Sequence, residues 1–382
     1  MISVIGGGPS GMMAAYSAKL HNPKTRVVLF DRNPNLGKKM RLTGGGRCNV
    51  TANVSLEDLV KSVVKNGRFL YSSFNNLGPQ EIQAFFKHYG VELIEEDHHR
   101  MFPKSHRSHD IVDACERALV DVGVELRLGV NVETLTPTSI SVDGTSIQCE
   151  HIIIATGGRT LPQTGSDGSG YEFASALGHT VTNLLPQEVP LVSNDALIQS
   201  KALQGLSFKD VQVKVKDGKK TLATLTHDLI ITHFGYSGPV ALRASFYVQR
   251  LIENQKGPVT LEIDFMPGFQ AIDDTHPNLQ KRLLDVLSKQ DSSLIDALKH
   301  FKTSIYATRG FSYAFVTNGG VMVKEIDPKT MKSKRFETIS FCGEVMDVSA
   351  FTGGYNITAA LSSGYTAGKY CMEGKYETVD IL

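Results

Sequence analysis

The stretch Gly6-Gly7-Gly8-Pro9-Ser10-Gly11 decides the fold, and it directly follows the apolar run of residues 2–5. Gly6, Gly8 and Gly11 match the spacing G-x-G-x-x-G of dinucleotide-binding turns. In such a turn the first glycine allows a sharp exit from a strand, the second lets the backbone approach a pyrophosphate, and the third lets a helix pack on the sheet. The N-terminus of that helix then offers backbone N–H groups and the positive end of its dipole to the phosphates.

The surrounding residues supply the context that this short pattern needs. Residues 12–20 carry small side chains at helical spacing, and residues 26–30 form a second β-rich run that ends at Asp31. Together they form one βαβ unit, whose right-handed crossover makes the sheet parallel. Asp31 follows Gly11 by twenty residues, where a carboxylate accepts hydrogen bonds from ribose hydroxyls and repels a 2′-phosphate. We therefore predict a dinucleotide other than NADP.

A second glycine-rich loop favours FAD over NAD. The loop reads Thr43-Gly44-Gly45-Gly46-Arg47-Cys48-Asn49. Its exposed amides and the Arg47 guanidinium suit a pyrophosphate or the polar edge of a flavin. The alternative is a plain surface turn, which three successive glycines beside a cation make the weaker interpretation.

Two further segments extend this prediction toward the C-terminus. The apolar run of residues 152–154 leads into Ala155-Thr156-Gly157-Gly158, which lets the chain pass close beside a cofactor. Glu344 follows a strand and can hold ribityl hydroxyls, and the helix after Gly354 can place its dipole at the isoalloxazine, where negative charge gathers on reduction. FAD is long enough to need both ends of the chain. No second G-x-G-x-x-G has its own strand and acidic partner, so no separate pyridine-nucleotide domain is expected.

Composition bounds the class of protein. The chain has 382 residues, 41% of them hydrophobic and 21% charged, with a net charge of +1, which is typical of a soluble globular enzyme. The balanced charge indicates neither nucleic acid nor a membrane surface as partner, and no apolar run is long enough to cross a bilayer. A strand starts at Ile2, which leaves no room for a signal peptide. The five cysteines lack a Cys-x-x-Cys pair and indicate free thiols, so we expect a cytoplasmic protein.

The predicted fold class is α/β, with a Rossmann domain interrupted by an insertion. From residue 186 the pattern changes to alternating strands, at 211–216, 222–232 and 259–265, which indicates an antiparallel sheet or small barrel. Leucines in residues 279–301 follow a helical stripe. The predicted domains are 1–185 for the first part of the FAD domain, 186–334 for the β-rich substrate domain with a helical subdomain at about 268–310, and 335–382 for the second part of the FAD domain.

Together, these residues resemble the aminoacetone oxidase family of bacterial FAD enzymes, which is related to bile-acid-type flavin reductases. The resemblance covers nearly the whole chain and rests on residues 6–11, 43–51, 100–103, 155–170, 232–239, 317–321 and 343–356. It implies a glutathione-reductase-like FAD domain, and more distantly it extends to fumarate reductase and succinate dehydrogenase flavoproteins. Those proteins often tether the flavin through a histidine. The corresponding residues 39–43 contain none, so the resemblance implies non-covalent FAD. One departure is His99, where the family usually has glycine.

The resemblance also assigns roles along the cofactor. Asp31 with Arg32 would hold the adenosine, the Val132 backbone would contact adenine, Glu344 would meet the ribityl chain, and residues 354–357 would meet the pyrimidine end. The expected cofactor-binding residues are Gly6, Gly8, Pro9, Ser10, Gly11, Asp31, Arg32, Lys39, Thr43, Gly44, Gly45, Gly46, Arg47, Cys48, Asn49, Val132, Ala155, Thr156, Gly157, Gly343, Glu344, Gly354, Asn356 and Ile357.

Several histidines and one cysteine suggest reactive sites but have simpler structural interpretations. Four histidines, at 98, 99, 106 and 109, suggest a metal cluster, but no ligating cysteine accompanies them and the intervening Arg100, Lys104 and Arg107 would repel a cation. We expect no metal. Cys48 would lie near the flavin, yet without a partner cysteine nearby a packing role is favoured over a redox role.

His233 is the candidate catalytic residue. It lies in the inserted domain, within Thr-His-Phe-Gly-Tyr-Ser-Gly-Pro at 232–239, and it could act as a general base or orient the substrate. The alternative is that His233 and Ser237 hydrogen-bond a tight turn before a helix that begins near Pro239. The sequence leaves both open.

The expected function is that of an FAD-dependent oxidoreductase. The resemblance implies an amine oxidase that converts aminoacetone to methylglyoxal, ammonia and hydrogen peroxide, with molecular oxygen as acceptor. A second hypothesis is an NAD(P)H-dependent reductase or dehydrogenase that acts on a larger lipophilic substrate. A third is a flavin-bearing binding or RNA-associated protein without turnover, which the neutral charge and the lack of a basic aromatic stripe disfavour. The sequence predicts no oligomeric state.

Overall fold

The computed structural model describes residues 1–254, 257–269, 276–289 and 293–372, and they divide into two units. Unit 1 combines Met1–Leu184 with the chain from Thr317 on, and unit 2 is Leu185–Val316. Unit 2 therefore ends earlier than the expected boundary at residue 334. The reason is that Val321, Ile326 and Met331 are fully buried in the core of unit 1.

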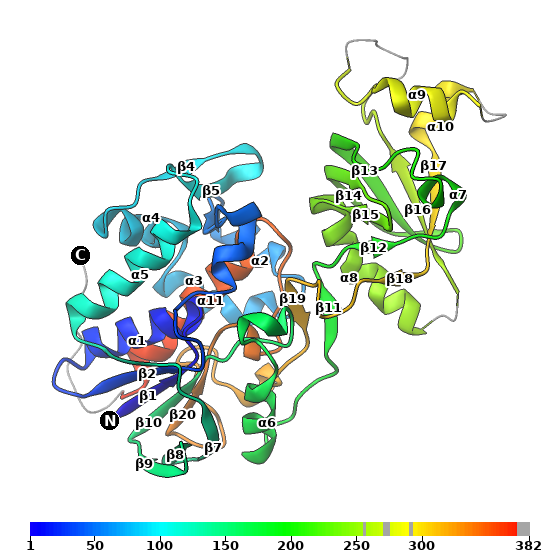
Figure 1. Cartoon of the computed structure of the whole chain (residues 1–382). Coiled ribbons are helices and arrows are strands. Elements are labelled where there is room, and N and C mark those ends of the chain that lie inside the picture. The colour runs from blue at the N-terminus through cyan, green and yellow to red at the C-terminus, as the bar shows by residue number, and fades with distance from the viewer. Residues whose placement is uncertain (255–256, 270–275, 290–292, 373–382) are drawn as a thin grey trace. The chain divides into compact units, whose positions relative to one another are not determined.

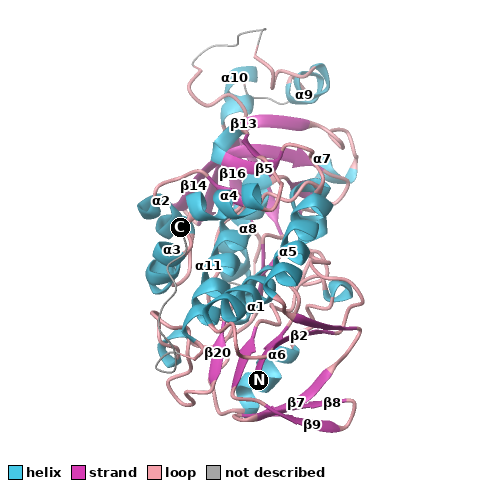
Figure 2. Cartoon of the chain, turned by 90° about the vertical axis from the view of Figure 1, so that its left-hand side faces the viewer, coloured by secondary structure: helices cyan, strands magenta, loops and turns pink. Residues whose placement is uncertain are grey.

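A five-stranded parallel sheet forms the centre of unit 1. Its strands run in the order β20-β10-β1-β2-β6, and every neighbouring pair is parallel. Their bounds are β1 (Ile2–Ile5), β2 (Val27–Asp31), β6 (Glu125–Leu128), β10 (His151–Ile154) and β20 (Ile339–Phe341). Helices α1 (Pro9–His21), α5 (Ser108–Val122) and α11 (Tyr355–Tyr370) lie on one side of this sheet. The antiparallel meander β7 (Val132–Thr136), β8 (Ser139–Val142) and β9 (Thr145–Gln148) lies on the other (Figure 1, Figure 2). The α/β fold class with a parallel Rossmann sheet is confirmed.

The remaining elements of unit 1 surround this sheet. The helices are α1 (Pro9–His21), α2 (Leu56–Ser62), α3 (Tyr71–Asn76), α4 (Pro79–His88), α5 (Ser108–Val122), α6 (Ser169–Ala176) and α11 (Tyr355–Tyr370). Short 3-10 turns are η1 (Met40–Gly46), η2 (Gly67–Leu70), η3 (Asp97–His99), η4 (Pro162–Thr164), η5 (Val323–Glu325) and η6 (Gly343–Val345). A small antiparallel sheet contains β3 (Thr51–Ala52), β4 (Leu93–Glu95) and β5 (Arg100–Pro103).

The first and last helices of unit 1 pack directly on each other (Figure 1, blue and red). The contact is close because α11 presents glycines: a Cβ on Gly364 would lie 2.2 Å from Ser10 O, and one on Gly368 would lie 2.3 Å from Ala14 O. The Ser17 hydroxyl also donates a hydrogen bond to the Tyr365 carbonyl at 2.7 Å. Residue numbers rise together along both helices, so α1 and α11 run in the same direction.

Unit 2 is built on a seven-stranded antiparallel sheet in the order β17-β16-β13-β14-β15-β12-β18. Tyr306 alone separates β17 from β18, so the two edge strands follow each other in the chain and the sheet curls in the expected barrel-like manner. The strands are β12 (Leu191–Val192), β13 (Ser207–Asp217), β14 (Lys220–Ile231), β15 (Gly235–Ser237), β16 (Val259–Asp264), β17 (Phe301–Ile305) and β18 (Ala307–Thr308). The helices are α7 (Ala196–Gln199), α8 (Pro239–Asn254), α9 (Lys281–Leu287) and α10 (Leu294–Lys299). Strands β11 (Leu185–Gln187) and β19 (Val316–Asn318) pair where the chain enters and leaves this unit.

The helical subdomain expected at about 268–310 is shorter than predicted. Helices α9 and α10 account for the leucine stripe, but from Phe301 the chain is a strand whose residues alternate between buried and less buried. The prediction at 279–301 therefore extended slightly too far, and residues 270–275 and 290–292 of the subdomain lie outside the described residues. No described helix combines the length and the apolar character that a bilayer span requires.

The α1–α11 contact gives a direct test of the fold. Gly364→Ala should destabilise the protein, because the added methyl overpacks against the Ser10 backbone at the upper end of the usual cost, about 3 kcal/mol. Alanine's higher helix propensity, about 1 kcal/mol, offsets only part of this loss. Thermal unfolding monitored by circular dichroism measures the change. Gly257→Ala is the matched control, since a Cβ there has no neighbour within 4 Å. Equal melting temperatures for both variants would contradict the close contact.

Candidate functional site

A pocket in unit 1 opens where β1 and β2 end, which is where parallel sheets of this kind bind ligands. It brings together the glycine turn, the end of β2 and the meander. Its lining residues are Ile5, Gly6, Phe30, Asp31, Arg32, Val130, Asn131, Val132, Thr156, Gly165, Ser169 and Phe173. Gly6, Asp31, Arg32, Val132 and Thr156, which the sequence predicts to bind the adenosine half of the cofactor or to lie along it, therefore meet in one place.

The three glycines of the turn differ in what they require. Gly6 has φ +109°, and a Cβ on it would lie 2.5 Å from Ala155 O. A Cβ on Gly11 would lie 1.8 Å from Gly6 O, whereas one on Gly8 would meet nothing within 4 Å. A side chain at Gly6 or Gly11 would therefore clash with neighbouring backbone atoms. The backbone at Gly8 has free space beside it, which a ligand can occupy. Gly8 is also the N-cap of α1 and provides no side-chain cap, so the first N–H groups of the helix are available to phosphates.

The carboxylate of Asp31 is held at the rim of the pocket by its neighbours. One oxygen accepts a hydrogen bond from the Gly7 N–H, and the other accepts from the Asn33 N–H at 2.7 Å. Arg32 forms an ion pair with Asp167 and donates to Asn131 Oδ1 at 3.0 Å. These bonds fix the orientation of both side chains before any ligand binds.

Thr156 adds an unpaired polar group to the same pocket. Its Oγ1 is buried and has no hydrogen-bond partner among the described residues, and such a group costs free energy unless something pairs with it. A bound cofactor would supply that partner. Together with the open backbone at Gly8, this observation shows that the residues present fit a dinucleotide.

The loop of residues 43–49 has the backbone geometry of a ligand-contacting turn. Gly44, Gly45 and Gly46 all have positive φ, at +58°, +67° and +84°, and a Cβ on the last two would meet nothing within 4 Å. Arg47 donates to both oxygens of Glu96, at 2.8 and 3.0 Å, and its guanidinium lies 4.1 Å from the ring centre of Phe102. The protein itself therefore holds Arg47 in place, and the expected contact of Arg47 with the cofactor stays a prediction.

The next residues attach this loop to the N-terminus of α11. Cys48 is fully buried, and burial raises the pKa of its thiol to about 12, which favours the packing role. With its amide oriented to satisfy both ends, Asn49 donates to Thr51 O and accepts from the Gly354 N–H at 3.0 Å. Asn356 in turn accepts from the Ala350 N–H at 2.9 Å. Ile357 is half-buried against the core of unit 1. The two glycine segments that the sequence assigned to the flavin are therefore neighbours.

Glu344 lies where three distant segments meet. It pairs with Lys39 at 3.0 Å and accepts a hydrogen bond from the Thr317 N–H at 2.6 Å. The Lys39 ammonium also donates to Thr160 Oγ1 at 2.7 Å. Gly343 has φ +74°, and a Cβ there would lie 2.4 Å from the Ser10 hydroxyl oxygen, so this segment also touches the glycine turn.

Sequence reasoning did not assign Thr160 and Thr317 to the site. Thr317 opens the segment 317–321 that carried part of the family resemblance, and that signal could have identified it. Thr160 follows the Gly157-Gly158 pair by two residues, and nothing in its own sequence context marks it.

The two parallel helices define the length of the site. Gly364 lies against Ser10 and is nine residues into α11 from Tyr355. Ser10 is one residue into α1 from Pro9, so at about 1.5 Å per residue the N-terminus of α11 lies about 12 Å beyond that of α1. Two positive helix ends therefore point the same way at different depths, as a ligand with a pyrophosphate and a distant electron-rich ring requires.

Comparison with known proteins identifies the family. The HI0933-like protein Rossmann domain matches residues 1–370. The chain belongs to this family. Its members bind FAD, so the predicted cofactor and the class of FAD-dependent oxidoreductase are confirmed.

Two curated relatives align from end to end. The 3-dehydro-bile acid delta(4,6)-reductase of Clostridium scindens is 28% identical, over 97% of this chain and 99% of the relative. The ribosomal RNA dihydrouridine synthase of Escherichia coli is 27% identical, over 97% of this chain and 98% of the relative.

Solved structures show the same fold at low identity. A flavocytochrome c3 fumarate reductase matches with a TM-score of 0.57 at 15% identity, over 97% of this chain and 78% of that one. A 3-ketosteroid-delta4-(5alpha)-dehydrogenase from Rhodococcus jostii matches with a TM-score of 0.54 at 13% identity, over 97% and 95%.

His233 lies in unit 2 with an exposed side chain. The turn around it is held by Thr232, whose N–H and hydroxyl both donate to Gly235 O, at 2.8 and 3.0 Å. The His233 ring contacts the Phe234 ring, with centroids 5.1 Å apart. Thr232 therefore supplies these hydrogen bonds of the turn, and both the structural and the catalytic role of His233 stay predictions.

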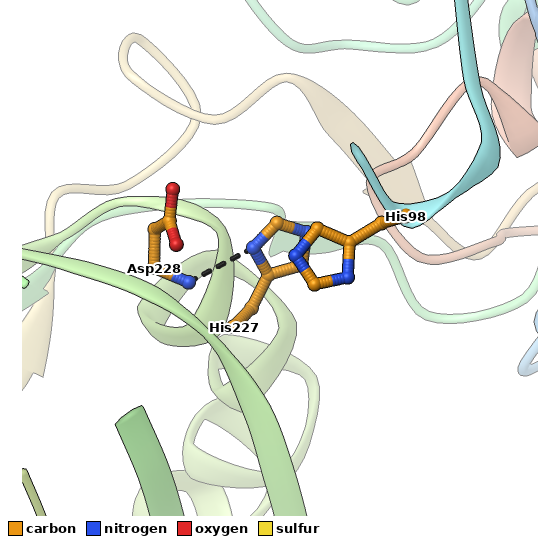
Figure 3. Close-up of side chains that lie close together, drawn as sticks. All are labelled: His98, His227 and Asp228. Atoms are coloured by element: carbon orange, nitrogen blue, oxygen red, sulfur yellow. Dashed lines mark hydrogen bonds between the residues drawn. The ribbon is translucent and has the colours of Figure 1, made fainter. Parts of the chain in front are cut away.

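Three of the four clustered histidines have separate partners within unit 1. His99 pairs with Glu95 at 2.7 Å, His106 lies 3.7 Å from Glu96, and the His109 ring lies 3.1 Å from Arg41. Among the described residues of either unit taken by itself, no three His, Cys, Asp or Glu side chains come close enough to share a metal ion. In unit 2, His227 accepts a hydrogen bond at Nδ1 from the Asp228 N–H at 2.9 Å (Figure 3). His98, also labelled there, belongs to unit 1.

Asp31→Asn tests the adenosine end of the site. Losing the charge weakens charge-assisted hydrogen bonds worth about 1.5–3 kcal/mol, so the dissociation constant of FAD should rise about 10- to 100-fold. Fluorescence titration of the apoprotein with FAD measures this. Asp113→Asn, on an exposed position of α5, should leave the affinity unchanged. An unaltered affinity in Asp31→Asn would remove Asp31 from the site.

Thiol labelling tests the role of Cys48. All five cysteines are buried, and burial raises the pKa of Cys48, Cys342 and Cys371 to about 12. At pH 8 only about one such thiol in ten thousand is ionised, so native protein should resist iodoacetamide while denatured protein labels at all five positions. Rapid native labelling at Cys48, located by mass spectrometry, would restore the redox interpretation.

Proposed function

We propose that this protein is an FAD-dependent reductase that saturates a carbon–carbon double bond conjugated to a carbonyl group. The observation that carries the proposal is the end-to-end similarity to two relatives with one chemistry and two very different substrates. A delta(4,6)-unsaturated 3-oxo bile acid has its double bonds conjugated to the 3-carbonyl. Uridine has its 5,6 double bond conjugated to the 4-carbonyl, and dihydrouridine is the saturated product. The bond reduced is common to both, so it is the best expectation for a third member.

The residues of unit 1 account for cofactor binding in this proposal. The turn at Gly6, Gly8 and Gly11 with the N-terminus of α1 would hold the pyrophosphate, and Asp31 would hold the ribose. Glu344, oriented by Lys39, would accept hydrogen bonds from the ribityl chain. When bound and reduced by a two-electron donor such as NAD(P)H, the flavin would supply the hydride for such a reduction and would return to its oxidised form.

The protein has two further tasks in this reaction. It must stabilise the negative charge that develops on the carbonyl oxygen as hydride reaches the β-carbon, and it must deliver a proton to the α-carbon. His233 is a candidate for the second task, because its side chain is exposed and its ring has no hydrogen-bond partner among the described residues, and histidine is the residue that most often transfers protons in enzymes.

The amine oxidase remains the second candidate. It would oxidise aminoacetone to methylglyoxal, ammonia and hydrogen peroxide with molecular oxygen, and it would need little acid–base help from the protein. Its support is the sequence resemblance, and neither curated relative described above is named an oxidase. The other hypothesis, an NAD(P)H-dependent reductase of a lipophilic substrate, is compatible with the main proposal, because in both the electrons pass from the flavin to the substrate.

Anaerobic half-reactions separate these functions. Flavin reduced with dithionite should be reoxidised by a 4-en-3-one steroid or by a uridine-containing RNA oligonucleotide, because both present the conjugated bond. The saturated 3-oxo steroid and the dihydrouridine oligonucleotide are matched controls and should leave the flavin reduced. Stopped-flow absorbance follows the oxidation state. Bleaching of oxidised enzyme by aminoacetone, with peroxide formed on admission of air and no reoxidation by either unsaturated compound, would overturn the proposal in favour of the oxidase.

A further inference from the structure

The segment 232–239 carried part of the family resemblance, yet none of its residues lies in unit 1, which contains the cofactor pocket. Within unit 2, Phe234 of this segment contacts Arg309, which lies 75 residues later in the sequence. The Arg309 guanidinium lies 4.6 Å from the ring centre of Phe234 and 3.6 Å from that of Tyr313. One arginine therefore stacks on two aromatic rings.

The backbone holds both sides of this cluster on the same strand. The Ser193 N–H, directly after β12, donates to Phe234 O at 3.0 Å, and the Arg309 N–H donates to Pro190 O, just before β12, at 3.1 Å. Gly235 must be glycine in this turn, since a Cβ would lie 2.2 Å from Leu191 O. The backbone of this turn therefore places Phe234 beside Arg309.

Arg309 has no ion-pair partner among the described residues. Within the same part of the chain no carboxylate lies within 4 Å of its guanidinium, and no oxygen accepts a hydrogen bond from its guanidinium N–H groups. Tyr313 is 50% exposed and Tyr306, next to β18, is 45% exposed. The aromatic surface is therefore half-exposed, and the planar guanidinium of Arg309 lies at its centre without a carboxylate partner among the described residues. Such a surface suits a ligand with a flat ring and a nearby negative charge.

That chemistry favours a nucleotide over a steroid. A nucleobase has a π face that stacks on tyrosine or arginine, and its phosphate pairs with a guanidinium. The aliphatic rings of a steroid have no π face and bind best in enclosed apolar surroundings. Arg250, which lies 4.0 Å from the ring centre of Phe246 on α8, has one ring only.

We propose that Arg309, Tyr313 and Phe234 form a binding platform for a nucleotide of single-stranded RNA, with the base stacked on the aromatic rings and a phosphate paired with Arg309. The platform deepens the proposed function, and the choice of uridine as the nucleotide rests on that function. It is an alternative to the expectation of no nucleic-acid partner, and both stay predictions until binding is measured.

Binding of a fluorescently labelled, uridine-rich RNA oligonucleotide to the oxidised holoprotein tests the platform by anisotropy. Arg309→Gln and Tyr313→Leu should each weaken binding about tenfold or more. Arg309→Gln should also lower the slope of log affinity against log salt by about 0.7, as expected for one lost phosphate contact on a single strand. Arg250→Gln is the matched control and should bind as the parent protein does. Unchanged FAD content and melting temperature would show that the variants are folded.

The binding outcomes do not depend on turnover. Binding that requires Arg309 and Tyr313 supports the platform even if the RNA fails to reoxidise reduced flavin, in which case the reductase proposal alone fails. Absence of RNA binding by the parent protein, or equal binding by Arg309→Gln and Arg250→Gln, overturns the platform and leaves the reductase proposal to be decided by the steroid substrate.

Discussion

The contact between α1 and α11 is the constraint on which the rest of unit 1 depends. These helices come from opposite ends of the chain, and they touch through backbone because Gly364 and Gly368 carry no side chains. Such a contact leaves no room for adjustment, since any Cβ there would overlap a carbonyl oxygen or amide. It therefore fixes the depth of one helix N-terminus relative to the other, and with it the length of ligand that the two positive ends can serve.

The same contact explains why the polar groups of the site come from many segments. Once the two helices are fixed, the loop of residues 43–49 is joined to Gly354 through Asn49, and Gly343 is pressed against Ser10. Lys39 and Glu344 then meet as a half-buried ion pair, which would be a weak source of stability by itself. Its value is geometric, because it orients a carboxylate that would otherwise rotate freely.

Much of unit 1 could be predicted because its signals are local. The glycine turn, the acidic end of β2 and the glycine-rich start of α11 each need a particular residue at a particular backbone position, and sequence records such requirements directly. The end of the inserted domain was harder to place, because Val321, Ile326 and Met331 are ordinary apolar residues and only the packed core shows which unit buries them. Hydrogen bonds between distant residues, such as Lys39 to Thr160 or the Thr317 N–H to Glu344, produce no repeating pattern in the sequence and so could not be predicted from it.

The aromatic platform shows the same limit in a sharper form. Phe234 and Arg309 become neighbours only because β15 and β18 both pair with β12, and no spacing rule connects them. A sequence pattern of basic residues with interleaved aromatic residues does not detect the platform, because one arginine and two aromatic rings come together only when the sheet forms. Net charge misses it too, because a whole-chain sum of +1 averages over a local cation such as Arg309, which has no carboxylate partner within the part of the chain that the structure describes. In an FAD-dependent oxidoreductase family whose members share the Rossmann unit, such local features of the inserted unit are where we expect substrate identity to be encoded, since the fold of the cofactor unit does not by itself specify a substrate.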